Sequence, residues 1–190
     1  GISSINESEN SFDDIIQKIV SDKKNKIPQF VNVARLSPEK NQKVLIEAFA
    51  KLKTIGVEAK LYILGSGILK EELETKIIEL NLSDSVQLLG HIENIRNFLP
   101  LMDYFIFPSL YEGQGMALLE AMSVGLLPIV SDIPTSREIV AGGNYGIISE
   151  SNDEQGLALA MMKALKKEEF SSFDLESYNK NVINRIKLIL

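Results

Sequence analysis

Two glutamates, Glu112 and Glu120, stand eight positions apart at the start of an almost wholly apolar stretch. The second lies in a predicted helix from Met116 to Val124, in which only Glu120 and Ser123 are polar. A half-buried carboxylate is costly unless hydrogen-bond donors approach it, and no basic residue lies within one helical turn of Glu120. Ligand hydroxyl groups would supply these bonds. The alternative is an ordinary glutamate on the one solvated stripe of a helix.

The start of this helix has the features of an anion site. Gly113 and Gly115 leave backbone N–H groups free there, and the helix dipole favours negative charge at the same end. Eight residues of helix rise about 12 Å, so the two glutamates could hold opposite ends of a ligand whose phosphates lie between them. A nucleotide-sugar has this shape.

Two cations occur in one predicted loop. Arg35 follows the first predicted strand, and Lys40 comes five residues later. An arginine can bind phosphate through two hydrogen bonds and a lysine acts as a point charge, so the pair suits a diphosphate. The alternative is a helix-entry loop with solvated charges, because the segment from 37 to 39 reads Ser-Pro-Glu.

A glycine turn and the single histidine complete the set of candidate residues. Gly65 and Gly67 follow the second predicted strand, but Lys70 stands where a dinucleotide fingerprint needs its third glycine, and no acidic residue ends the next strand. We therefore expect only a tight turn that leaves room for a ligand to approach. His91 has no partners for metal ligation and is more typical of a loop or structural residue.

Composition narrows the class of protein. The chain has 190 residues, 45% of them hydrophobic, which favours one domain. Its formal charge of −6 argues against a nucleic-acid partner. The chain contains no cysteine, no apolar run long enough for a bilayer and no visible signal peptide, so we expect a cytoplasmic location. It begins with glycine rather than methionine, as if excised from a longer protein, and its polar first two dozen residues hold one amphipathic stretch, Phe12 to Val20.

Strand-like and helical patterns alternate along the chain. The predicted strands are Gln29 to Ala34, Lys60 to Leu64, Val86 to Leu89, Tyr104 to Phe107, Leu127 to Ser131 and Gly146 to Ile148. The predicted helices are Val44 to Lys53, Leu69 to Leu80, Ile95 to Leu101, Met116 to Val124, Pro134 to Val140, Asp153 to about Lys167, and Leu175 to Leu190. The alternation predicts an α/β, Rossmann-like, doubly wound parallel sheet of about six strands with helices on both faces.

In such a sheet, ligands bind outside the carboxyl ends of the strands. We expect a single domain over residues 1–190, with a core of about 28–165 and C-terminal helices in 153–190. No Asp-x-Asp stands at a strand end, so a diphosphate held by a metal ion has no support in the sequence. Arg35 and Lys40 would have to neutralise it instead.

Together, these motifs resemble the nucleotide-binding half of retaining glycosyltransferases of family 4, over roughly residues 28 to 165. The resemblance rests on Arg35 to Lys40, Gly65 to Gly67, Gly90 with His91, Pro108 with Ser109 and the two glutamates, and Ser131 to Glu138. It implies one half of a GT-B fold, whose N-terminal acceptor domain is absent from this chain. It also implies that the final predicted helix packs back toward that domain.

The resemblance further implies a role for each candidate residue. Arg35, Lys40 and Glu112 form the catalytic set, in which the cations hold the donor diphosphate and Glu112 meets the donor sugar. Glu120 holds the ribose, and His91 and Ile92 border the base. The donor-binding set is Gly65, Gly67, His91, Ile92, Gly113, Gln114, Gly115, Met116, Ala117 and Glu120. Two positions depart from the family: Gln114 replaces a frequent aromatic residue and Asn41 a frequent glycine.

The resemblance implies an enzyme that transfers a sugar from a nucleotide donor such as a UDP-sugar, with retention, no metal and no cofactor. The acceptor would be a glycan or a lipid-linked glycan in cell-surface polysaccharide synthesis, and the full-length enzyme would associate peripherally with the inner face of the membrane. One alternative is a non-hydrolysing nucleotide-sugar epimerase. The others are a flavodoxin-like domain or a nucleotide-binding domain without catalysis.

Overall fold

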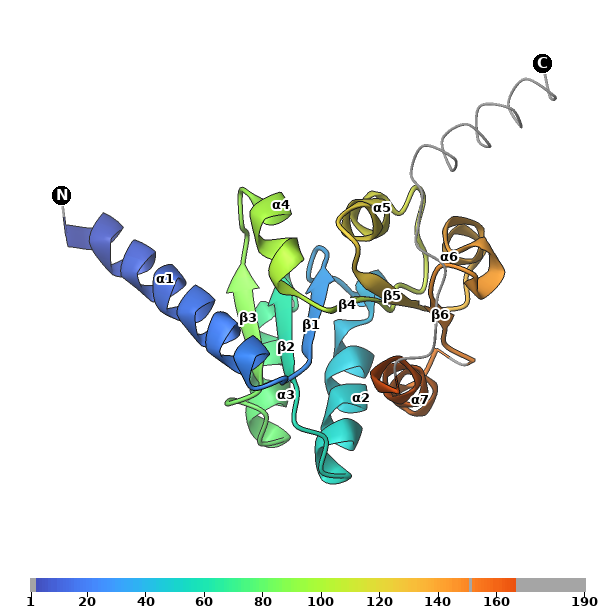
Figure 1. Ribbon diagram of the computed structural model, residues 1–190, viewed down its shortest axis with the longest axis horizontal. Coiled ribbons are helices and arrows are strands. Elements are labelled where there is room, and N and C mark those ends of the chain that lie inside the picture. Colours follow the sequence, from blue (N-terminus) through green and yellow to red (C-terminus); the bar gives the residue numbers. More distant parts are fainter. Residues whose placement is uncertain (1–2, 151, 167–190) are drawn as a thin grey trace, which may run out of the picture.

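Six strands form one parallel sheet in the computed structural model, which describes residues 3–150 and 152–166 (Figure 1). Their order across the sheet is β3-β2-β1-β4-β5-β6. The strands are β1 (Gln29–Val33), β2 (Lys60–Leu64), β3 (Val86–Gly90), β4 (Tyr104–Phe107), β5 (Leu127–Val130) and β6 (Ile147–Ile148). The predicted doubly wound sheet is confirmed, with each strand within about a residue of its expected bounds.

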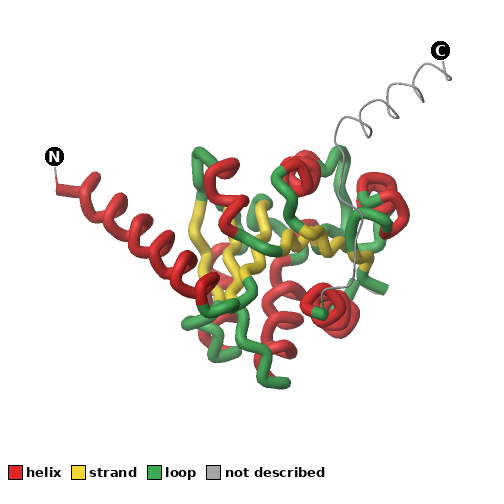
Figure 2. The backbone as a smooth tube through the Cα atoms, viewed as in Figure 1, coloured by secondary structure: helices red, strands yellow, loops and turns green. Residues whose placement is uncertain are grey.

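Helices cover both faces of this sheet (Figure 2). One face packs against α2 (Gln42–Thr54), α3 (Lys70–Glu79) and α7 (Glu154–Leu165). The other packs against α1 (Ser3–Lys24), α4 (Ile95–Phe98), α5 (Met116–Ser123) and α6 (Pro134–Ile139). Short 3-10 turns η1 (Pro38–Lys40), η2 (Leu99–Leu101) and η3 (Ala141–Gly143) connect these elements.

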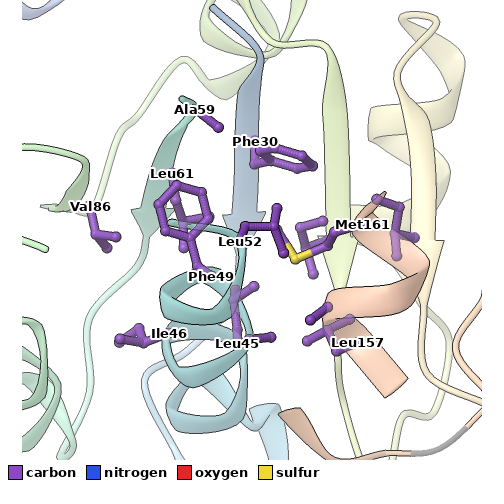
Figure 3. Packing of buried hydrophobic residues seen from close by; sticks show 14 of the residues in the cluster. Phe30, Leu45, Ile46, Phe49, Leu52, Ala59, Leu61, Val86, Leu157 and Met161 are labelled. Atoms are coloured by element: carbon purple, nitrogen blue, oxygen red, sulfur yellow. The ribbon is translucent and has the colours of Figure 1, made fainter. Parts of the chain in front are cut away.

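The core lies in two layers because neighbouring strand residues point to opposite faces. In β1, Phe30 joins the cluster under α2 and α7, whereas Val31 joins the cluster on the other face. Figure 3 shows Phe30 above Leu45 and Phe49 of α2, with Met161 of α7 beside them. Strands buried on both faces read as continuous apolar runs, which is why the sequence reveals them.

The strand order reverses between β1 and β4. From β1 the chain proceeds outward through β2 and β3, then returns to pair β4 with the other edge of β1. The loops that follow β1 and β4 therefore diverge from a common point at the carboxyl edge of the sheet, which leaves a crevice for a ligand. Arg35 lies on the first of these loops and Glu112 on the second.

Helix α1 is longer than the predicted amphipathic stretch Phe12 to Val20, with 22 residues, and its N-terminal part extends away from the sheet in Figure 1. Its C-terminal part is docked. The Lys23 ammonium donates to the Asp103 carboxylate (2.9 Å), whose other oxygen accepts from the Gln29 backbone N–H (2.8 Å). The predicted helix Leu175 to Leu190 lies outside the described residues.

Candidate functional site

Two adjoining cavities open at the carboxyl edge of the sheet. The first, of about 460 Å³, is lined by Val33, Ala34, Arg35, Lys40, Phe107, Glu112, Gly113, Gln114, Gly115, Met116 and Ala117. The second, of about 480 Å³, is lined by Val33, Ala34, Arg35, Leu64, Gly65, Ser66, His91, Ile92, Glu93, Ile95, Ala117 and Glu120. They share four lining residues, including Arg35. We call the pair the groove.

The first cavity brings together the three residues assigned above to the catalytic set. Arg35 follows β1, and its carbonyl oxygen accepts a hydrogen bond from the side chain of the fully buried Gln42 (2.8 Å). The Lys40 ammonium forms an ion pair with the Glu112 carboxylate, and both side chains are less than one fifth exposed. Residues 72 positions apart thus meet at one wall of the groove.

The N-terminus of α5 lines the same cavity. Gly115 precedes the helix with a φ of +63°, a conformation that favours glycine. A Cβ atom there would lie 2.6 Å from Ile139 Cδ1 of α6. The turn therefore brings α5 and α6 close together and aims the first amides of α5 at the cavity lined by Gly113 to Ala117.

Two contacts outside the cavities fix the loop that carries Glu112. The Thr135 hydroxyl of α6 donates to the Glu112 carbonyl oxygen (2.8 Å). The Leu110 backbone N–H donates to the Glu39 carbonyl oxygen (2.9 Å), which joins this loop to η1. Neither role was predicted from the sequence motifs. The signal available was the position of Thr135 in the segment Ser131 to Glu138, which carries part of the family resemblance.

Glu120 borders the second cavity, and its side chain is 29% exposed, so the expected half-burial is confirmed. The bonds that ligand hydroxyl groups are expected to donate to its carboxylate stay a prediction, and in the free chain a protein side chain supplies one bond. Arg96 of α4 donates from Nε to Glu120 Oε1 at 2.9 Å. This partner lies 24 positions away in the chain, well beyond one helical turn, so sequence spacing did not reveal it.

The glycine turn after β2 contacts protein rather than open space. A Cβ on Gly65, whose φ is +132°, would lie 1.9 Å from the Ala34 carbonyl oxygen, and one on Gly67 would lie 2.2 Å from the Leu36 carbonyl oxygen. The space that a side chain would take at these two glycines is thus filled by the loop after β1. Gly65 still lines the second cavity with His91 and Ile92, whereas Gly67 lines neither cavity.

Hydrogen bonds and an ion pair also lower the pKa of two carboxyl groups that line neither cavity. The Ser37 hydroxyl donates to Glu39 Oε1 (2.6 Å), and this bond lowers the pKa of the Glu39 carboxyl. The Arg137 guanidinium binds both oxygens of Asp132 and lowers the pKa of that carboxyl.

Among the described residues, no group of three or more His, Cys, Asp or Glu side chains could hold a metal ion. No helix in the described ranges is long and apolar enough to cross a membrane.

Comparison with known sequences gives a family match over most of the chain. A model of the family described as "Glycosyl transferases group 1" matches residues 12–184. One relative comes from Campylobacter jejuni subsp. jejuni serotype O:2 and is named N-acetylgalactosamine-N,N'-diacetylbacillosaminyl-diphospho-undecaprenol 4-alpha-N-acetylgalactosaminyltransferase. It is 34% identical over 146 residues, which is 76% of this chain and 39% of the relative. The UDP-Gal:alpha-D-GlcNAc-diphosphoundecaprenol alpha-1,3-galactosyltransferase of Escherichia coli is 30% identical over 184 residues, covering 93% and 47%.

Comparison with solved structures gives the same fold. The crystal structure of HepE from Anabaena in complex with UDP and glucose superposes with a TM-score of 0.70 at 21% identity, covering 85% of this chain and 48% of that one. The chain spans less than half the length of both relatives and of this structure.

Proposed function

This chain belongs to the glycosyl transferases group 1 family, and on that premise we propose that it is the nucleotide-sugar-binding half of a metal-independent retaining glycosyltransferase of family 4. The remainder of the full-length enzyme would supply the acceptor domain of a GT-B pair. The length of the relatives supports this division, because the chain matches 39% and 47% of them.

One observation carries the proposal: Arg35, Lys40 and the N-terminus of α5 converge on one cavity, and the cavity that borders Glu120 adjoins it. A diphosphate in the first cavity would meet two fixed cations and a helix N-terminus. The attached ribose would reach Glu120, and the base would lie beside His91 and Ile92. This is the order of groups in a nucleotide-sugar.

The chemistry follows from where charge develops. When the bond between the sugar and the diphosphate breaks, negative charge grows on the departing diphosphate, and Arg35, Lys40 and the α5 amides stabilise it without reorganising. Glu112 adjoins the same cavity and would accept hydrogen bonds from the hydroxyl groups of the donor sugar. In the free chain, the Lys40 ammonium is paired with the Glu112 carboxylate. When the donor binds, this ammonium would leave the carboxylate and pair with a phosphate instead.

The comparisons favour particular substrates. The HepE crystal structure is a complex with UDP and glucose, and the name of the E. coli relative specifies UDP-Gal. Both relatives are named for diphosphoundecaprenol-linked glycans. We therefore propose a UDP-sugar donor and a lipid-linked glycan acceptor, and we propose that the full-length enzyme acts peripherally at the cytoplasmic face of a membrane.

The residues of the groove disfavour the two other protein classes. A flavodoxin-like receiver domain holds magnesium through carboxylates at strand ends, whereas the loop after β1 brings Arg35 and Lys40 to the cavity. An epimerase needs additional acid/base groups at the sugar. Among the described residues, Glu112 is the only carboxylate that lines the first cavity.

Calorimetric titration of the chain with UDP, GDP and ADP tests the proposal. We expect UDP to bind, and Arg35→Ala or Lys40→Ala to weaken its affinity about tenfold, because each removes a charge-assisted contact to phosphate. Lys70→Ala is the matched control, since Lys70 pairs with Glu74 on α3 away from both cavities. Affinity should be equal in magnesium and in EDTA. Unchanged affinity in both variants would remove the cations from the diphosphate site.

A further inference from the structure

We propose that Arg96 is a positioning residue of the nucleoside subsite, which holds the Glu120 carboxylate in the orientation that receives the ribose hydroxyls. It also offsets the charge of that carboxylate beside a diphosphate. The inference rests on the proposed function of the groove and deepens it by naming the residue that prepares ribose recognition.

The geometry leaves the carboxylate open to a second partner. Arg96 lies in the first turn of α4 and contacts Glu120 through one nitrogen, Nε, and one oxygen, Oε1. An ionised carboxylate offers about four lone-pair sites, so Oε2 and part of Oε1 remain available to the cavity. A ribose diol presents two O–H donors. Arg96 and the diol can therefore bind Glu120 at the same time, and the guanidinium need not be displaced.

The charges of the groove give Arg96 a second effect. The two cavities are lined by the cations Arg35 and Lys40 and by the carboxylates Glu93, Glu112 and Glu120. Negative groups thus outnumber positive ones, although the ligand is an anion. A cation bound directly to Glu120 removes this excess. Because charges at a surface are screened by salt, the contribution should be largest at low ionic strength.

The exposure of Arg96 separates this role from a structural one. Its side chain is 78% exposed, and an exposed ion pair adds little to the free energy of folding. Replacing Arg96 should therefore leave the unfolding temperature unchanged while altering ligand affinity. Arg137 offers a matched control, because it is also an exposed arginine paired with a carboxylate, and it lines neither cavity.

The test is a titration of UDP and of 2′,3′-dideoxy-UDP into the chain at low salt, by calorimetry. We expect Arg96→Ala to weaken the affinity for UDP about fivefold, which corresponds to the energy of a partly exposed charge pair. The affinity for the dideoxy analogue should fall less than about twofold. Arg96→Lys should recover part of the loss, because it restores the charge but not the planar contact. Arg137→Ala should change neither affinity. In a Glu120→Ala background, Arg96→Ala should have no further effect on UDP.

Each outcome bears on one of the two proposals. If the unaltered chain binds none of UDP, GDP and ADP, both the proposed function and this inference are wrong. If UDP binds but Arg96→Ala leaves its affinity unchanged, or weakens both ligands equally, only the inference is overturned. A loss that persists in the Glu120→Ala background would likewise exclude action through Glu120.

Discussion

Each glutamate of the pair is held by a cation from another element in the free chain. Lys40 of η1 holds Glu112, and Arg96 of α4 holds Glu120. The two ion pairs differ in burial, since the first is less than one fifth exposed whereas Arg96 is largely solvated. Water screens the first pair less, so the Glu112 carboxylate competes more strongly with a phosphate for Lys40.

Removing the charge of Glu112 should therefore separate diphosphate binding from sugar binding. We expect Glu112→Gln to tighten UDP about threefold, because Lys40 is released and a repulsive carboxylate is lost. The extra affinity of a UDP-sugar over UDP should fall, because a glutamine accepts sugar hydroxyls less strongly. Calorimetry with UDP and UDP-glucose measures both effects. Glu154→Gln is the control, since Glu154 pairs with Lys51 outside the groove. Weaker UDP binding in Glu112→Gln would contradict the exchange of Lys40.

At the scale of elements, the turn into α5 sets the shape of the groove. We expect Gly115→Ala to destabilise the fold by about 1–3 kcal/mol, because its φ of +63° disfavours a Cβ and Ile139 of α6 must move. UDP should also bind more weakly as the first amides of α5 shift. Urea unfolding and calorimetry measure the two effects.

Gly113→Ala is the matched control for that substitution. Gly113 lines the same cavity, but it has no positive φ and an added Cβ would meet no atom within 4 Å. We expect its unfolding free energy to stay within about 0.5 kcal/mol of the unaltered chain. An equal loss of stability in the two variants would refute a special role for the Gly115 turn.

The elements were largely predictable from sequence because their signals are local. Tyr104 to Phe107 is a buried run that ends at Pro108, and β4 has the same bounds. The first residues of α1 were not predicted as helix because their polar sequence has no apolar period. The sequence motifs identified most of the polar cavity-lining residues but not Ser66 or Glu93, and they did not identify the apolar lining residues Val33, Ala34, Leu64, Ile95 and Phe107.

Contacts between elements were beyond sequence patterns. Arg96 meets Glu120 only because α4 and α5 dock on the same face of the sheet, and Thr135 reaches the Glu112 carbonyl only because α6 packs beside α5. The sequence pattern predicts a tight turn at Gly65 and Gly67, but it does not show why glycine is required there. Their partners are backbone atoms of the loop after β1, whose path depends on the pairing of β1 with β2.

At the scale of the whole molecule, α1 covers the same face of the sheet as α4 and α5. Ile19 of α1 is fully buried in the same cluster as Tyr62 of β2 and Phe98 of α4. Tyr62 and Phe98 meet edge to face, with ring centroids 6.0 Å apart. Burial, and then the negative charge of Asp22 on α1, raise the pKa of Tyr62 to about 12 from an ordinary value of 10.0.

This shift makes the stability of the fold sensitive to alkaline pH. The pKa of Tyr62 is higher in the folded chain than in the unfolded chain. Its contribution to the free energy of unfolding is therefore fully present below pH 10 and is lost as the pH rises from about 10 to about 12. The loss amounts to roughly 2–3 kcal/mol. In Tyr62→Phe, the free energy of unfolding measured with urea should decline less steeply across this range. The decline that remains would come from Tyr104, whose pKa is also raised by burial. Tyr111→Phe, at an exposed position, should keep the full slope. A Tyr62→Phe chain that declines as steeply as the unaltered one would show that Tyr62 does not contribute to the alkaline loss of stability.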